Sequence, residues 1–496
     1  MRSIAVPMLL LSAALAQSQA YAADVTPKGA KELKHQILSN LPDSMAKNSG
    51  AITVRPRQNA YELRIDAIAL FGLEALKFTK TMGIKPIVSL LRPLEGGLWQ
   101  FDQAGGIDVQ GSSGKKAAKT DFHVSVESYS SSGIYDPTIT YFQSGKFTSD
   151  GIRILLKSAK GSTDIALDKA DSTIESKRDG DSTITMASIS SFTGLKEVVD
   201  NKVIDKAGAG PKAVRVTVRS ASGESGGKAE GVVYKPLQQI LPIVARNWGK
   251  PKLDEADKTL LIQLFRSNFP LFKTATQSVS YNDLQVDTPQ GPFTTKRFAM
   301  TSTIDGIRNG AHFSFGLEMT EPRAPTAPIP AAYTPLLPDT IAVNVALPSV
   351  NAADGINYVI DHVDFDPAHQ MTPPEKSELG RQFFPDGTVT ITYDGTHIGS
   401  SLYDISIDGK TSFTLTGTDK PLADVTIKVR DFDKAVAYLQ AHTKEEPKFA
   451  QAAFFLLMAK GFAENQADNI QVWHVETDRT GQVLVNGRPF KVPGQQ

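Results

Sequence analysis

Thr388-Val-Thr-Ile-Thr-Tyr393 alternates polar and apolar side chains residue by residue, and three later segments repeat the pattern. They are Leu402–Ile407, Thr411–Leu415 and Ala423–Val429, with Asp394-Gly395 and Asp408-Gly409 between neighbours. A period of two is typical of a strand with one buried face, and Asp-Gly pairs favour hairpin turns. The stretch therefore predicts an antiparallel β-meander over 388–429.

The same alternation is found in much of the rest of the chain, at 213–218, 297–304, 312–319 and 341–346. A short repeat also recurs every ten residues, as Gly161-Ser-Thr-Asp-Ile165, Asp171-Ser-Thr-Ile174 and Asp181-Ser-Thr-Ile184. This spacing favours one strand and one turn per repeat. The fold class that we predict is α+β, mostly antiparallel β, with long curved sheets.

Helical periodicity is the second pattern in the sequence. Leu253, Ala256, Leu260, Leu264 and their neighbours form one apolar stripe at helical spacing. Further helices are predicted at 30–41, 432–442 and 447–462. We expect the helices to pack on one face of the sheets.

Proline follows four helical or apolar segments, at Pro42, Pro270, Pro338 and Pro385, and each time an alternating segment comes next. Proline cannot continue a helix and makes the preceding residue extended. The recurrence suggests a duplicated helix–proline–strand unit, with uneven spacings that exclude a solenoid.

Two segments have the composition of linkers. Ser220–Gly231 is rich in Gly and Ser and is predicted to be a mobile loop, and Glu321–Pro338 is rich in proline and is predicted to run extended. The domains that we predict are a signal peptide at 1–22, an N-terminal β-rich domain with one leading helix at 23–234, and a C-terminal α+β domain at 235–496.

The first 22 residues have the composition of a cleavable signal peptide. Arg2 is their only charge, Ile4–Leu15 is largely apolar, and Ala20 and Ala22 are small residues at the −3 and −1 positions. We predict cleavage near Ala22 and a periplasmic protein of the cell envelope.

Composition excludes several classes of function. The chain has no cysteine, which rules out disulfides, thiolate metal sites and cysteine nucleophiles. Basic and acidic residues are equal in number, 53 of each, so charge gives no reason to expect nucleic acid as a partner. No apolar run after the signal is long enough for a transmembrane span. We expect no cofactor.

The densest set of side chains that can bind metal lies within 361–369: Asp361, His362, Asp364, Asp366 and His369. On a strand, Asp364 and Asp366 would share a face with His362 and offer oxygen and imidazole ligands to a divalent cation. A metal-dependent hydrolase is therefore one alternative function. Solvated acids before a turn are the simpler interpretation.

Other patterns are weaker. Gly223-Glu-Ser-Gly-Gly227 has the spacing of a nucleophile elbow, but no amphipathic helix follows it. His442 and His474 stand alone in the sequence, which favours partly buried or surface histidines over acid–base catalysts. We predict no catalytic, cofactor-binding or metal-binding residue and a protein that is not an enzyme.

Two groups of aromatic and apolar residues suggest binding of polysaccharide or of lipid. Trp99, Tyr129, Tyr135 and Tyr141 would form a polysaccharide-binding platform if they were exposed on one sheet face. The segment Phe449–Ala463 has almost no polar side, so as a helix it is either enclosed or in contact with lipid.

The ending Gly481-Gln-Val-Leu-Val-Asn486-Gly487-Arg-Pro489 resembles the closing segment of YdgA-like Gram-negative envelope proteins. The resemblance implies an envelope role and supplies no catalytic residues. The function that we expect is non-enzymatic: binding or scaffolding an envelope component, a lipid or an outer-membrane protein.

Overall fold

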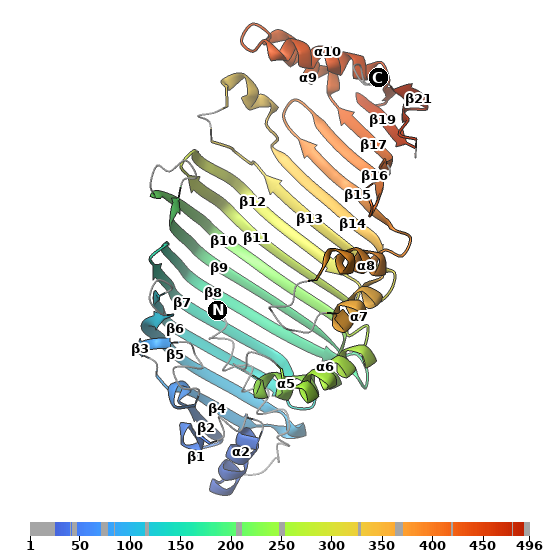
Figure 1. Ribbon diagram of the computed structural model, residues 1–496. Coiled ribbons are helices and arrows are strands. Elements are labelled where there is room, and N and C mark those ends of the chain that lie inside the picture. Colours follow the sequence, from blue (N-terminus) through green and yellow to red (C-terminus); the bar gives the residue numbers. More distant parts are fainter. Residues whose placement is uncertain are drawn as a thin grey trace. The chain divides into compact units, whose positions relative to one another are not determined.

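The computed structural model describes residues 25–39, 41, 47–70, 78–83, 85–114, 119–204, 211–247, 253–325, 329–362, 371–417, 420–478 and 480–490. The chain forms two compact units, Met1–Ala275 (unit 1) and Thr276–Gln496 (unit 2). Both consist mostly of antiparallel strands, as predicted (Figure 1). Within the described ranges, no helix is both long and apolar enough to cross a membrane.

Unit 1 contains a sheet in which neighbouring strands are mostly neighbours in sequence. Its pairings run β1–β2–β4–β5–β6–β7–β8–β9–β10, and β3 pairs with the second half of β5. The strands are β1 (Ile52–Arg57), β2 (Ala60–Ile65), β3 (Phe78–Met82), β4 (Ile87–Pro93), β5 (Trp99–Ser113), β6 (Thr120–Asp136), β7 (Tyr141–Ser158), β8 (Gly161–Arg178), β9 (Thr183–Ile204) and β10 (Pro211–Val233). Helices α2 (Pro27–Ser39), α5 (Lys235–Arg246) and α6 (Glu255–Ser267) complete the unit.

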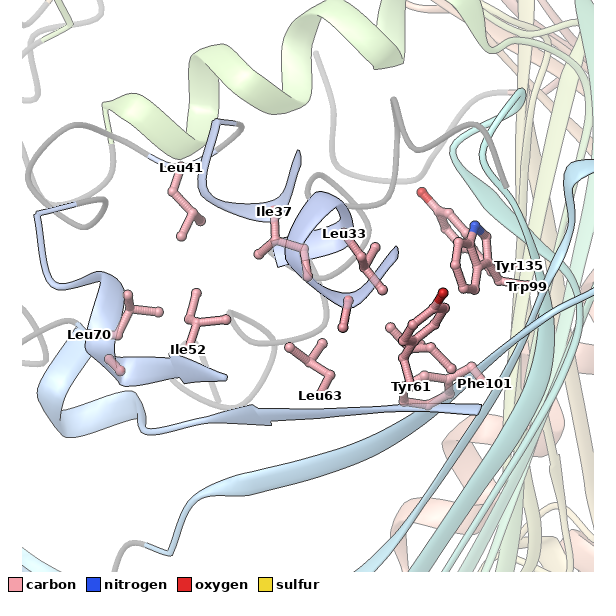
Figure 2. Packing of buried hydrophobic residues seen from close by; sticks show 13 residues of the cluster. Leu33, Ile37, Leu41, Ile52, Tyr61, Leu63, Leu70, Trp99, Phe101 and Tyr135 are labelled. Atoms are coloured by element: carbon pink, nitrogen blue, oxygen red, sulfur yellow. The ribbon is translucent and has the colours of Figure 1, made fainter. Parts of the chain in front are cut away.

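The core of unit 1 lies beneath α2. Leu33 and Ile37 of this helix point toward Leu63 of β2, with Trp99 and Phe101 of β5 nearby (Figure 2). Thr26 starts the helix, and its hydroxyl accepts a hydrogen bond from the backbone N–H of Gly29 at 3.0 Å. The predicted leading helix is confirmed, with its observed start at Pro27.

The long strands of unit 1 are interrupted by glycines with positive φ. Gly151 of β7 has φ +61° and lies opposite Glu127, and Gly194 of β9 has φ +66° and lies beside Asp168 of β8. Glycine adopts a left-handed backbone at little cost, whereas a residue with a Cβ does not, so these two strand positions favour glycine.

Unit 2 contains the pairings β12–β13–β14–β15–β16–β17–β19, with β18 and β20 on the far edge of β19 and β21 beyond β20. The strands are β11 (Thr274–Thr288), β12 (Gly291–Ile304), β13 (Ala311–Thr320), β14 (Thr340–Val350), β15 (Thr388–Gly399), β16 (Asp404–Thr414), β17 (Leu422–Arg430), β18 (Glu464–Gln466), β19 (Ile470–Thr477), β20 (Val483–Val485) and β21 (Arg488–Phe490). The helices are α7 (Ala352–His362), α8 (Pro373–Phe383), α9 (Phe432–Ala441) and α10 (Lys448–Lys460).

The predicted meander is confirmed, but its turns are not where the Asp-Gly pairs suggested. Asp394-Gly395 lies inside β15 and Asp408-Gly409 inside β16. The pairing register shifts between Tyr393 and Thr396, and the N–H of Gly395 donates to the Asp408 carboxylate at 2.9 Å. The pairs therefore form a bulge in one long hairpin, since glycine provides the positive φ that a bulge requires.

Three other expectations are wrong. Ser220–Gly231 is not a loop but part of β10, and most of its residues from Ser220 to Ala229 pair with β9. The repeats at 161 and 171 lie on the same strand, β8, so no turn separates them. The proline-rich segment 321–338 contains a bridge between Arg323 and Thr294 and a 3₁₀ helix at Ala331–Leu336, instead of running extended throughout.

The helix–proline–strand junctions are present where the structure describes them. Pro270 lies between α6 and β11, Pro338 between the 3₁₀ helix and β14, and Pro385 between α8 and β15. Pro42 and the predicted signal peptide 1–22 lie outside the described residues. That the junctions are copies of one duplicated unit stays a prediction.

Candidate functional site: the apolar face of unit 2

The predicted metal set lies mostly outside the described residues, which include only Asp361 and His362. Both are in the last turn of helix α7, so the assumption of a strand is wrong for them. His362 stacks on Tyr358 with 3.9 Å between ring centroids, and its Nδ1 donates to the Tyr358 carbonyl oxygen at 2.9 Å. Across the residues that the structure describes, no group of three or more His, Asp or Glu is placed to hold a metal ion.

The elbow-like sequence does not have the geometry of a nucleophile. Ser225 lies in the middle of β10, directly opposite Ser190 of β9. A nucleophile elbow needs a sharp turn from a strand into a helix to expose its serine oxygen. Ser225 is therefore an ordinary strand residue.

His442 and His474 each contact neighbouring side chains or backbone of their own unit. His442 ends helix α9, where its Nδ1 donates to the Tyr438 carbonyl oxygen at 2.8 Å and its ring stacks on Tyr438. His474 is on β19, with Nε2 at 3.6 Å from carboxylate oxygens of both Asp424 and Glu476.

The four aromatic residues considered for polysaccharide binding do not form an exposed platform. Trp99 and Tyr135 are buried in the core beneath α2. Tyr141 packs against another buried cluster, and Tyr129 stacks on Phe147 while its hydroxyl accepts from Gln103 at 3.0 Å. The buried rings of Trp99 and Tyr135 are not available to stack on sugars, and Tyr129 and Tyr141 are half-buried against neighbouring side chains.

What the sheet of unit 2 does contain is a continuous apolar face. Residues directly opposite one another in an antiparallel pair point to the same face. The register places one apolar side chain from each of six strands in a single row: Phe298, Met319, Ile341, Ile398, Ile405 and Val429. At the spacing of paired strands, this row is roughly 24 Å long.

Further apolar side chains on the same face extend it along the strands. Leu317 lies opposite Met300 and Val343, and Phe315 lies opposite Val345, which in turn lies opposite Tyr393. These residues and the row above are called the apolar face from here on.

The reverse side of the same strands is polar. Glu318 is the neighbour of Leu317, and Lys410 lies opposite Asp424 with 3.8 Å between their charged atoms. The sheet of unit 2 therefore has an apolar face and a polar face.

Burial differs along the apolar face. At one end, Ile405, Ile427 and Val429 pack under Phe432 and Val436 of α9 and Leu456 of α10. Phe315 of β13, the second strand of the row, is 39% exposed, and Phe413, farther along β16 from Ile405, is 38% exposed. The residues Leu317, Val343, Val345 and Tyr393 are only half-buried. The described part of unit 2 thus leaves this part of the apolar face accessible to solvent.

Unit 1 has a shorter face of the same kind. Ile107, Val126, Ile152 and Leu167 lie in one row across β5 to β8, and all four are half-buried.

Helix α10, which the sequence marked as apolar on all sides, has one enclosed and one exposed side. Phe449 and Ala453 are buried against Leu439 of α9, whereas Phe454 and Phe455 project outward.

The sequence identified several strands of the apolar face but not the face itself. Alternation in 312–319 and 341–346 fixes which residues share a side of each strand. Only the pairing register shows that those sides are continuous over six strands. Comparison of this chain with protein-family models, with curated proteins and with solved structures gives no match.

Proposed function

We propose that this protein is a non-enzymatic protein of the cell envelope that holds the alkyl chain of a lipid against the apolar face of unit 2. One observation carries the proposal: an apolar row crosses six paired strands while part of the face stays half-exposed. Contiguous exposed apolar surface of this extent is typical of a binding site.

The dimensions and chemistry of the face fit an alkyl chain. One leaflet of a bilayer is about 15 Å of hydrocarbon, so a row of roughly 24 Å accepts an extended acyl chain. The face offers no charged side chain along the row, so a compact polar ligand would lose its hydrogen bonds with water and gain none.

Helices complete the proposed site. α9 and α10 contact the apolar face at Val429, and Gly380 of α8 lies against Leu415 at the end of β16. In our proposal the helices pack on this one face, with α9 and α10 near Val429 and α8 near the far end of the adjacent strand β16.

The proposal extends to location. We propose that residues 1–22 are a signal peptide, cleaved near Ala22, and that the mature protein is periplasmic. The mass of the protein purified from an envelope fraction tests this, because a chain that keeps residues 1–22 would contradict export by cleavage.

Lipid binding is tested by introducing a charge on each face of the same sheet. Phe315→Asp places a carboxylate on the exposed part of the apolar face, whereas Thr301→Asp places one on the polar face of the neighbouring strand, opposite Gly316. The probe is a fluorescent fatty acid, added to delipidated protein. We expect Phe315→Asp to weaken probe binding by about tenfold or more, since an ionised group beside an alkyl chain is desolvated without compensation, and Thr301→Asp to leave it unchanged.

Far-UV circular dichroism and the urea midpoint establish that both variants fold. Extraction of the untreated protein should also yield a co-purified lipid. Absence of probe binding to the unmutated protein, or equal loss in the two variants, would contradict the proposal.

A further inference from the structure

We infer that the exposed side of helix α10 inserts into the surface of a phospholipid bilayer. This inference deepens the lipid-binding function and rests on it for its biological purpose. It concerns different residues, however, and is tested separately.

The patch consists of three large apolar side chains on one helix. Phe454 is 58% exposed, Phe455 is 50% exposed and Leu457 is 45% exposed. The two phenyl rings meet edge to face with 5.9 Å between centroids, so they form one continuous apolar surface. Such a surface on a convex helix suits insertion among lipid chains better than it suits a ligand that needs a cavity.

The patch is held rigidly on unit 2. The Trp473 indole N–H donates to the carbonyl oxygen of Ala459 at 2.8 Å, and Lys460 forms an ion pair with Asp433 of α9. Phe449, on the opposite side of α10, packs edge to face on Tyr333 at 4.8 Å. The exposed side is therefore presented by a packed helix and does not require unfolding.

Continuity with the apolar face selects a lipid bilayer as the occupant. Leu456 lies between the exposed residues Phe455 and Leu457, and it packs in the same cluster as Ile405, Ile427 and Val429 of the sheet. In our proposal an alkyl chain that leaves a bilayer at the patch reaches the sheet past Leu456, which packs in this cluster. A partner protein would have no need of this connection.

Charged groups around the patch are compatible with a headgroup layer. Lys448 is exposed and shares a helical face with Phe455, seven residues later, and Lys444 is exposed just before the helix. Long lysine side chains can reach phosphate groups while the apolar residues insert. Glu445 is also exposed here, so we expect anionic lipid to strengthen binding modestly and apolar insertion to dominate.

The experiment is flotation of the full-length mature protein with vesicles of phosphatidylethanolamine and phosphatidylglycerol. We expect the double variant Phe454→Ser/Phe455→Ser to lose about tenfold or more of its vesicle binding, because transfer of apolar area drives insertion. The matched control is Ile189→Ser, which removes an equally exposed apolar side chain, 62% exposed, from β9. It should float like the unmutated protein.

A second variant reports the contact directly. The fluorescence of Phe455→Trp should shift to the blue on adding vesicles and should be quenched by brominated lipids. If this variant shows neither change, or if Ile189→Ser loses as much binding as the double variant, the inference is wrong. Concentration-dependent dimers that disappear in the double variant would also overturn it, since the patch would then be a contact between copies.

The two proposals fail in distinguishable ways. Binding of the soluble fluorescent fatty acid, measured without vesicles, should be unchanged in Phe454→Ser/Phe455→Ser, because these residues are not on the sheet. Vesicle binding without fatty-acid binding would refute the proposed function alone, and the reverse would refute bilayer docking alone.

Discussion

Gly194→Ala is a sharp test of the backbone requirement within the long strands of unit 1. Gly194 has φ +66°, a conformation that costs a residue with a Cβ roughly 1–2 kcal/mol. A Cβ at this position would also lie 2.0 Å from Oδ2 of Asp168 on the neighbouring strand. Because Asp168 is exposed, its side chain can rotate away, so the steric part is smaller than the backbone part.

The matched control is Gly227→Ala in β10 of the same sheet. The nearest atom to a Cβ there is Ser188 Oγ at 3.4 Å, which is ordinary contact, and its φ is not positive. Alanine in a strand has less conformational entropy to lose than glycine, so this variant should be more stable by about 0.5 kcal/mol. Gly194→Ala should instead be less stable by about 1–2 kcal/mol.

Urea unfolding followed by far-UV circular dichroism measures the difference. Asp168→Ala, combined with Gly194→Ala, should recover the smaller steric part, about 0.5 kcal/mol, and leave the backbone part. Equal unfolding midpoints for Gly194→Ala and Gly227→Ala would refute the reasoning, since the two glycines would then not differ in backbone requirement.

Two further predictions concern buried polar groups. Burial raises the pKa of Asp136, but hydrogen bonds from Thr138 and Gln143 and the charge of Arg178 outweigh it, so the pKa lies below its ordinary 3.8. The stability from this carboxylate is complete above about pH 4 and is lost as pH falls through the lower folded value. Asp136→Asn should cost about 1–3 kcal/mol at pH 7, and its difference from the unmutated protein should shrink in urea titrations at pH 3. A constant difference would contradict this. Asn486→Ala should cost about 3 kcal/mol, because it removes three hydrogen bonds made by the side chain and places alanine at φ +47°. Thermal unfolding of Asn486→Ala beside Asn486→Gly, which keeps the backbone freedom, separates the two contributions.

Local sequence patterns predicted the helices and strands in which apolar residues recur with a clear helical or strand period. The helix at 432–442 was correct to within a residue, and so was the strand starting at Thr388. Ser220–Gly231 was misjudged because Gly and Ser have weak strand preferences of their own. It is extended because β9 pairs with most of it, so tertiary pairing overrides local propensity.

The closing segment shows what a motif can and cannot predict. Asn486-Gly487 has positive φ at both residues and joins β20 to β21, as an Asn-Gly hairpin turn requires. The sequence does not show that the Asn486 side chain also donates to the carbonyl oxygens of Phe462 and Val472. Those contacts link residues more than ten positions apart, and only the fold brings them together.

The candidate site was least predictable because it is a property of pairing and not of any segment. Each strand contributes one or two apolar side chains to the row from Phe298 to Val429, which is ordinary for a half-buried strand. A sheet normally covers such a face with a second layer, since exposed apolar area favours aggregation. In the described part of unit 2, α9 and α10 cover the end of the row at Val429, and Phe315 on β13 stays exposed. We propose an alkyl chain as the occupant of this surface, because its binding requires only apolar contacts, which the face provides.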